Sequence, residues 1–539
     1  MRSSIRRVLA VASVLVLVPS AAHAAKPVPV SGGVAGEVEA VSPDGTVLAL
    51  DAGRKGGLKG AVVDGSGRPS VTTALGGWGG SSAVAASSPA GAAAVAAPSD
   101  GNDHLVVGLR APGSPFAPFA DLATTAASNT ASSVAVAGGV VLAGGTASRS
   151  GSTTQEPVVL RRLADGTAPA PVVLPGPPGQ GIDAFDVQVG VDDAGRGVVA
   201  WTTGAKAARR VQVATIAADG TLGTPVALPG VAPAGPYADQ PSAVLVRVAP
   251  DGTGAVAWRS DGRTRVAPVS TTAGVDVSGA ASVPMVGATA LQPDGAAVVV
   301  SAKRSKGTVT ARVAGRAAGK SFSAVRTKRG VRGGVVGVAL ARGRWVAAFA
   351  TDPLGRDLHP SSLLTGDAGG VPSPVLGLPT ASISQLSLRV AAPGGRPLAF
   401  ARARREIEDR DGGVRQTGVR TETLRVAAGT PKRARASFSM ASSQRIGRGK
   451  QTLRLRLTCR SACAYRVLGT VRVGTGGRFD VARTASRGTH TVRVPYQGES
   501  SGHEASKPLR VTKRSRIAIA VDDAAGGETI WRRTVTVRP

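Results

Sequence analysis

Two similar stretches, identical at six of eleven positions, decide the fold: VDDAGRGVVAW at residues 191–201 and VAPDGTGAVAW at residues 248–258. Each contains the end of one strand, a turn built on Asp and Gly, and a second strand whose apolar residues lead to a tryptophan. Asp and Gly favour such turns because Gly adopts positive φ without a steric penalty and Asp hydrogen-bonds its own backbone. The two stretches lie 57 residues apart, so they predict a repeated β-hairpin unit.

The same turn recurs along most of the chain, at successive spacings of 46, 48, 56, 57, 43, 48 and 52 residues. Each unit has room for four short strands and shows no helical periodicity, which is typical of a β-propeller blade. We therefore predict an all-β protein whose residues 33–430 form a propeller of about eight four-stranded blades. Seven blades is the alternative, because the first unit is the least regular. The turns are anchored on Gly45, Gly91, Gly139, Gly195, Gly252, Gly295, Gly343 and Gly395.

This repeat resembles the broad class of secreted bacterial propeller-repeat proteins, a resemblance that implies an architecture and no particular activity. The turns are also similar to the Asp-box of sialidase-type propellers, S-x-D-x-G-x-x-x-W. Val191 and Ala249 stand where that motif has Ser or Thr, and the spacing differs. We therefore interpret these turns as ordinary β-hairpin turns that favour Asp and Gly, and not as Asp-boxes.

The pattern changes after residue 430. Leu453, Leu455 and Leu457 alternate with Arg454 and Arg456, as in a strand with one buried and one solvated face. Similar strands continue to the C-terminus and predict a small, basic β-sandwich at residues 431–539. This segment resembles the immunoglobulin-like modules that end many secreted bacterial proteins, although the Cys-Trp-Cys spacing of true immunoglobulin domains is missing.

The first residues have the pattern of an export signal. Arg2, Arg6 and Arg7 precede an apolar run at residues 8–18, and Ala-His-Ala at 22–24 fits a cleavage site. We expect residues 1–24 to be a signal peptide, residues 25–32 a short linker, and the mature protein to be secreted or extracytoplasmic. Association with the cell envelope and the choice between Sec and twin-arginine export stay open. No transmembrane segment is expected, since the apolar run is too short for a bilayer core of about 30 Å.

The chain has two cysteines, Cys459 and Cys463. In an oxidising compartment a disulfide between them is the expected state. A zinc site completed by His490 and His503 is the alternative, but these spacings fit no common zinc module. We therefore expect neither a metal nor a cofactor.

Catalytic motifs are weak. The string GESSG at residues 498–502 matches G-x-S-x-G, yet it lies between strands of an all-β domain and not at the strand-to-helix turn that this motif requires. We assign no catalytic residue. Asp183, Asp186 and Asp239 are expected in loops that open on one face, so a propeller glycosidase or lyase acting on an anionic polysaccharide is the alternative function.

The charge of the chain favours a binding function. The chain has 65 Lys and Arg against 34 Asp and Glu, a net charge of +31, which favours contact with anionic partners. With the strands of each blade called A to D, the A–B turns carry Asp44, Asp193, Asp251 and Asp294, while the B–C loops on the opposite face are basic. The predicted binding residues for an anionic partner are Lys206, Arg209, Arg210, Arg259, Arg263, Arg265, Lys303, Arg304 and Lys306.

These observations together predict an exported, monomeric, non-enzymatic binding or scaffold protein. The expected partner is an anionic cell-envelope polymer or an acidic protein, contacted by the propeller loops and by the C-terminal domain, which has 23 Lys and Arg against 6 Asp and Glu. Nucleic acid is not expected, because aromatic residues make up only 3% of the chain and do not interleave with the basic ones.

Overall fold

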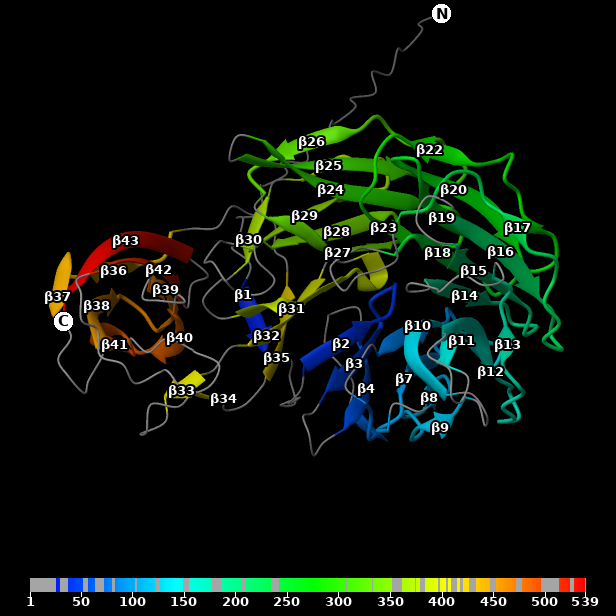
Figure 1. The fold of residues 1–539 in the computed structure, drawn as a ribbon, viewed down its shortest axis with the longest axis horizontal. Coiled ribbons are helices and arrows are strands. Elements are labelled where there is room, and N and C mark those ends of the chain that lie inside the picture. Colours follow the sequence, from blue (N-terminus) through cyan, green and yellow to red (C-terminus); the bar gives the residue numbers. More distant parts are fainter. Residues whose placement is uncertain are drawn as a thin grey trace, which may run out of the picture.

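Strands and turns make up the described part of the chain (Figure 1). The computed structural model describes residues 26–538 except for 30–36, 52–56, 64–71, 80–82, 102–103, 123–126, 149–154, 177–185, 205–208, 234–241, 306–307, 332, 351–360, 374, 379–382, 396–397, 404–405, 409–413, 417–419, 426–432, 446–451, 472–476, 496–512 and 524–527. The predicted signal peptide lies outside these residues. No helix among them is long and apolar enough to cross a membrane.

Eight antiparallel sheets follow one another along the chain and form the predicted β-propeller. The first four, with strands A to D in order, are β2 (Glu37–Val41), β3 (Val47–Asp51), β4 (Leu58–Val62) and β5 (Thr73–Gly76); β6 (Val84–Ser87), β7 (Ala93–Pro98), β8 (Leu105–Arg110) and β9 (Ala120–Asp121); β10 (Ala127–Ala137), β11 (Val140–Ser148), β12 (Gln155–Arg162) and β13 (Val172–Val173); β14 (Val187–Val191), β15 (Gly197–Thr203), β16 (Arg210–Ile216) and β17 (Val226–Ala227).

The next three sheets repeat this order. They are β18 (Val244–Val248), β19 (Thr253–Ser260), β20 (Arg263–Ser270) and β21 (Gly274–Val275), with β22 (Ala281–Val283) also paired to β20; β23 (Ala288–Leu291), β24 (Ala297–Ser305), β25 (Thr308–Arg316) and β26 (Arg326–Arg329); β27 (Gly334–Ala341), β28 (Arg344–Ala350), β29 (Ser361–Asp367) and β30 (Leu376–Leu378).

The eighth sheet closes the ring with both ends of the propeller. Its strands are β31 (Ile383–Ala391), β32 (Leu398–Ala403), β35 (Arg420–Arg425) and, at the outer edge, β1 (Lys26–Pro29) (Figure 1). The short 3-10 turn η2 (Pro393–Gly395) joins β31 to β32, and the hairpin β33 (Glu406–Glu408) and β34 (Val414–Gln416) precedes β35.

Strand β1 lies within the segment that we expected to be a linker, and it pairs with β35 as the outer strand of the eighth sheet. The pairing runs from Lys26 opposite Arg425 to Pro29 opposite Glu422. Prolines at 27 and 29 are compatible with this position, because alternate residues of an edge strand point their N–H groups away from the sheet. This strand could not be predicted from the local sequence, since its partner strand β35 lies about four hundred residues away.

All eight anchor glycines lie in the A–B turns, with φ between +69° and +89°. A residue with a Cβ rarely adopts this conformation, which explains why glycine recurs at this point of every unit. The unit of Gly45 forms the complete sheet β2 to β5, so the structure has eight blades and not seven.

The apolar core lies between neighbouring blades rather than inside any one of them. Trp201 and Trp258 are fully buried, in the clusters between the third and fourth and between the fourth and fifth blades. Each indole Nε1 donates to a carbonyl at the end of the preceding blade, Pro175 O at 3.1 Å and Pro229 O at 3.2 Å. A further cluster joins the eighth blade to the first, with Phe400 packed near Leu48.

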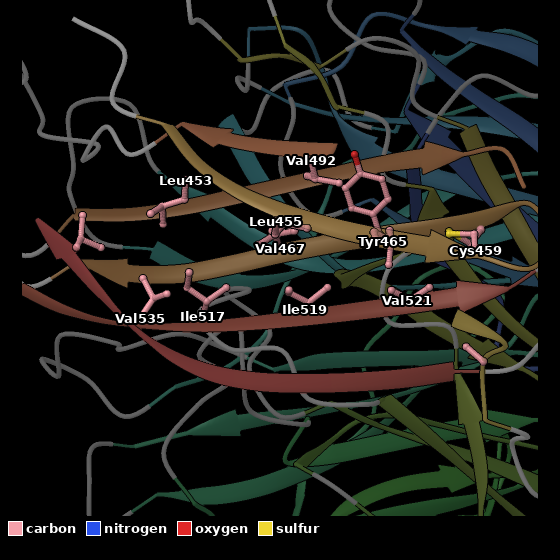
Figure 2. Packing of buried hydrophobic residues seen from close by; sticks show 14 residues of the cluster. Leu453, Leu455, Cys459, Tyr465, Val467, Val492, Ile517, Ile519, Val521 and Val535 are labelled. Atoms are coloured by element: carbon pink, nitrogen blue, oxygen red, sulfur yellow. A yellow bond between two sulfur atoms is a disulfide. The ribbon is translucent and has the colours of Figure 1, made fainter. Parts of the chain in front are cut away.

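The C-terminal segment folds into two sheets packed face to face around one core (Figure 2). One sheet has β36 (Ala436–Ser439), β38 (Thr452–Cys459) and β41 (Gly488–Pro495); the other has β37 (Ser443–Arg445), β43 (Glu528–Arg538), β42 (Lys513–Asp523), β39 (Cys463–Val471) and β40 (Gly477–Ala485). The disulfide between Cys459 and Cys463 is confirmed. The resemblance to immunoglobulin-like modules and the domain boundaries stay predictions.

Candidate anion-binding surfaces

Two of the predicted loop cations are buried. Arg209 is 5% exposed and donates Nη1 to Pro233 O at 3.1 Å. Arg259 is 6% exposed; burial lowers the pKa of its guanidinium, and the nearby Asp186 carboxylate partly offsets that effect. Both side chains therefore offer little surface to an external anion.

The other candidates of the fourth and fifth blades lie nearer to solvent. Arg210 donates Nη1 to Arg209 O at 3.0 Å, and Arg265 donates to both the carbonyl and the hydroxyl of Ser260. Arg263, at the start of β20, is exposed. Lys206 and Lys306 lie outside the described residues, so their positions stay predictions.

Lys303 and Arg304 are exposed at the end of β24 and belong to a larger group of cations spread over both sides of the sixth blade. In register, Lys303 is opposite Thr310 of β25, which is opposite Arg329 of β26. Residues directly opposite one another point to the same side of a sheet, and strands lie about 4.8 Å apart, so Lys303 and Arg329 flank a strip about 10 Å wide. We call the six cations of these strands the blade-six patch: Lys303, Arg304, Arg312, Arg326, Lys328 and Arg329.

Within the part of the chain that the structure describes, none of these six side chains has a hydrogen-bond or ion-pair partner. The sequence contained a signal for the patch that loop-by-loop inspection missed. Residues 295–351 hold twelve Lys and Arg and no Asp or Glu. Clustered, unneutralised cations on strands generate a local positive potential that is larger than net charge alone would give.

A second basic surface lies on the outer side of the smaller C-terminal sheet, opposite the buried leucines of β38. Arg454 of β38 is directly opposite Arg493 of β41, and Arg456 is opposite Thr491. Like charges directly opposite each other destabilise a sheet, so an anion placed between them would be favourable. Ser439, Arg454, Arg456 and Thr491 line a shallow hollow of about 300 Å³ at this face. We call Arg454, Arg456 and Arg493 the sandwich arginine face.

A partly open hollow lies at the A–B turn end of the propeller and was not predicted. Its volume is about 580 Å³, and residues from the innermost strands or their turns in all eight blades line it. Its walls are mainly Val, Ala, Leu and Pro, and its charged lining residues are Asp44, Arg110, Arg247 and Arg342. We call it the axial cavity.

Arg247 stands out in the repeat. It lies five residues before its anchor glycine, where the other seven units have Ala, Ala, Val, Gly, Ala, Val and Val. Alignment of the eight units would therefore have revealed it as a single charged residue on the inner strands at this level.

The described carboxylates do not form a recognisable hydrolytic pair. Asp186 is buried and accepts backbone hydrogen bonds from Ala243 N at 2.5 Å and Val244 N at 3.3 Å. Desolvation raises the pKa of Asp186, and hydrogen bonds and Arg259 oppose this rise. Asp183 and Asp239 lie outside the described residues. Among the residues that are described, no group of three His, Cys, Asp or Glu is arranged to hold a metal ion.

The aspartates of the A–B turns act locally. Asp251 Oδ1 accepts from Thr253 N at 2.9 Å, and Asp294 Oδ1 accepts from Ala296 N at 2.9 Å. This is the Asx-turn geometry expected of hairpins. Asp44 additionally reaches the next blade, because Ser87 Oγ donates to its Oδ1 at 2.5 Å.

No protein-family model matches this chain, and no curated protein matches it. Among solved structures it is similar to an ulvan lyase of polysaccharide lyase family PL25, with 11% identity over 76% of this chain and 96% of that one and a TM-score of 0.38. It is also similar to the β-propeller domain of the Trilobed protease from Pyrococcus furiosus, with 10% identity over 67% of this chain and 96% of that one and a TM-score of 0.31.

A third similar structure is PorZ, a bacterial surface component of the type-IX secretion system of Porphyromonas gingivalis, with 15% identity over 92% of this chain and 64% of that one and a TM-score of 0.32. Identities and TM-scores this low carry no argument about activity. The fold assignment rests on the eight sheets themselves.

Proposed function

We propose that this chain is an exported, non-enzymatic binding protein that holds an anionic polymer of the cell envelope on the blade-six patch and the sandwich arginine face. The observation that carries the proposal is the blade-six patch: six cations on adjoining strands, without partners among the described residues and within a 57-residue stretch free of acidic residues. Export is supported by the signal-like N-terminus and by the disulfide, which suits an oxidising compartment.

The spacing of the patch suits a flexible polymer better than a small anion. Lys303, Arg312 and Arg329 share one side of the sheet by register, and Arg304, Arg326 and Lys328 share the other. A chain with repeated negative charges can contact several of these groups at once, and each contact raises the effective concentration of the next. A single small anion could neutralise only a fraction of the patch.

The alternative, a glycosidase or lyase on an anionic polysaccharide, has less support. Of the three aspartates that suggested it, the described one, Asp186, is buried with its carboxylate engaged by backbone N–H groups. A substrate could not approach that carboxylate without displacing the start of the fifth blade.

The test is retention of the mature chain on immobilised polygalacturonate over a salt gradient. The patch variant is K303Q/R304Q/R326Q/K328Q/R329Q. The matched control removes the same charge from scattered exposed positions, R344Q/R460Q/R487Q/R514Q/R538Q. We expect the patch variant to elute at much lower salt than the control, because salt screens over about 8–10 Å and a local cluster acts within that range. Equal losses would refute a localised site.

A third variant, R454Q/R456Q/R493Q, measures how much the sandwich arginine face contributes to retention on polygalacturonate. The proposal predicts a further loss when it is combined with the patch variant. Retention unchanged by this triple substitution would confine the polymer site to the propeller. Release of unsaturated or shortened sugars from soluble polygalacturonate would favour the enzymatic alternative.

A further inference from the structure

The axial cavity contains a cation that the fold does not neutralise. Arg247 lines the cavity from β18 and makes one described hydrogen bond, from Nη1 to the adjacent Val246 O at 2.6 Å. Its Nε is buried without a partner among the described residues. A guanidinium has five N–H donors, and burying such a group unsatisfied is costly.

The one carboxylate lining the cavity is already occupied. Asp44 accepts hydrogen bonds from the hydroxyls of Ser42 at 2.6 Å, Thr46 at 2.7 Å and Ser87 at 2.5 Å. It acts on Arg247 only through space. Burial lowers the pKa of Arg247 to about 10, and Asp44 partly offsets that effect, so Arg247 remains a cation at neutral pH. The other lining cations add positive charge: Arg110 donates to Gly91 O at 2.8 Å, and Arg342 is exposed on its turn.

The rest of the wall is apolar. Val134, Val189, Leu291 and Leu340 line the space together with alanines and prolines. A volume of about 580 Å³ lies within the range of small-molecule sites, which combine apolar walls with a few polar anchors. A bare inorganic anion would leave this apolar wall without contacts, whereas a neutral apolar molecule would leave Arg247 unpaired.

We propose that the axial cavity binds a small amphipathic organic acid, whose carboxylate pairs with the Arg247 guanidinium and whose apolar body lies against the Val and Leu side chains. A carboxylate forms short, charge-assisted hydrogen bonds with a guanidinium, and so supplies the counter-charge that Arg247 lacks at the cavity wall. This site is separate from the polymer-binding surfaces, since its lining residues include none of the blade-six patch.

The test measures binding of octanoate to the full mature chain by titration calorimetry. Octanamide, which keeps the apolar body without the charge, and inorganic phosphate, which keeps the charge without the apolar body, are the comparison ligands. Octanoate should bind with one-to-one stoichiometry, and octanamide and phosphate about ten-fold or more weakly, since each lacks one of the two interactions. Equal binding of octanoate and octanamide would refute the role of the cation. Equal binding of phosphate and octanoate would refute the amphipathic ligand, as would the absence of octanoate binding.

Three variants locate the site. R247Q should weaken octanoate binding about ten-fold or more, to the level of octanamide, and R247K should lie between, because lysine keeps the charge and loses the fork. The control R344Q removes an exposed arginine next to the same end of the propeller but outside the cavity lining, and should leave binding unchanged. An effect of R344Q as large as that of R247Q would overturn the assignment.

Folding and the polymer proposal are tested separately. R247Q removes a cation that has no carboxylate partner within hydrogen-bond distance, so its Tm without ligand should stay close to that of the native protein, while octanoate should no longer raise it. Octanoate should not displace the protein from polygalacturonate. Loss of one binding activity without the other would therefore show which of the two proposals fails.

Discussion

The tie between Trp258 and the preceding blade offers a direct test of how the propeller is held together. The indole is buried and packs in the cluster between the fourth and fifth blades, and its Nε1 donates to Pro229 O at 3.2 Å. Trp258→Phe keeps most of the packing and removes this hydrogen bond. Because Ser260 Oγ still donates to Pro229 O at 3.0 Å, the carbonyl keeps a partner and the substitution should cost about 0.5–1.5 kcal/mol. Trp258→Ala also opens a cavity between the blades and should cost about 3–5 kcal/mol.

The measurement is urea unfolding followed by far-UV circular dichroism, which does not depend on tryptophan fluorescence. Trp201→Phe is the internal replicate, because Trp201 donates to Pro175 O at 3.1 Å in the neighbouring interface. Trp201→Phe should cost at least as much as Trp258→Phe, because among the described residues no second side chain donates to Pro175 O. The two costs should add in the double variant, since the two tryptophans share no cluster. A Trp258→Phe variant as stable as the native protein would refute the hydrogen-bond argument, and one as unstable as Trp258→Ala would refute the packing argument.

Three further predictions concern Asp186, the closing strand and the disulfide. Burial raises the folded-state pKa of Asp186, so the contribution of Asp186 to stability falls as pH rises from the ordinary Asp pKa through the folded-state pKa. Over this pH range the Tm of Asp186→Asn should therefore rise relative to the Tm of the native protein. A Tm difference that does not change with pH would contradict this. A chain starting after Pro29 lacks β1 and should be about 1–3 kcal/mol less stable in calorimetry, because the hydrogen bonds between β1 and β35 are lost. An unchanged Tm would show that β1 does not stabilise the closed ring of blades. Thiol titration of the unreduced protein should find no free thiol, and Cys459→Ser with Cys463→Ser should cost about 2 kcal/mol on the chain-entropy argument for so short a loop; a variant of native stability would show that the bridge is not stabilising.

Local chemistry explains why the blades were predictable. The turn at each anchor glycine depends on a few adjacent residues, so Gly195 and Gly252 mark their hairpins without reference to the rest of the chain. Strand β1 shows the limit of this approach. Lys26 pairs with Arg425, and nothing in residues 25–32 alone distinguishes an edge strand with prolines from an extended linker.

The binding residues were harder to predict because burial depends on neighbouring blades. Arg209 and Arg263 both lie at the start of third strands and look alike in sequence, yet Arg209 is covered by the loop that holds Pro233, and Arg263 is exposed. Arg247 was within reach of sequence reasoning, since aligning the units isolates it. Its lack of a carboxylate partner, by contrast, depends on how Asp44 is held. Ser42 and Thr46 of the same turn hydrogen-bond to Asp44, and assembly of the ring adds Ser87 of the next blade.

The same residue type therefore has a different role at each level of a blade. On an innermost strand Arg247 lines the axial cavity; at the end of a second strand Arg259 is buried beside Asp186; and on an outermost strand Arg326 and Arg329 are exposed. Net charge counts these residues equally, whereas a polymer contacts only the exposed ones. If contact with the exposed cations governs adhesion, retention on polygalacturonate should follow the number of cations that remain in the blade-six patch and the sandwich arginine face. Substitution of Arg247, despite the same change in net charge as any single arginine of these surfaces, should leave retention almost unaltered.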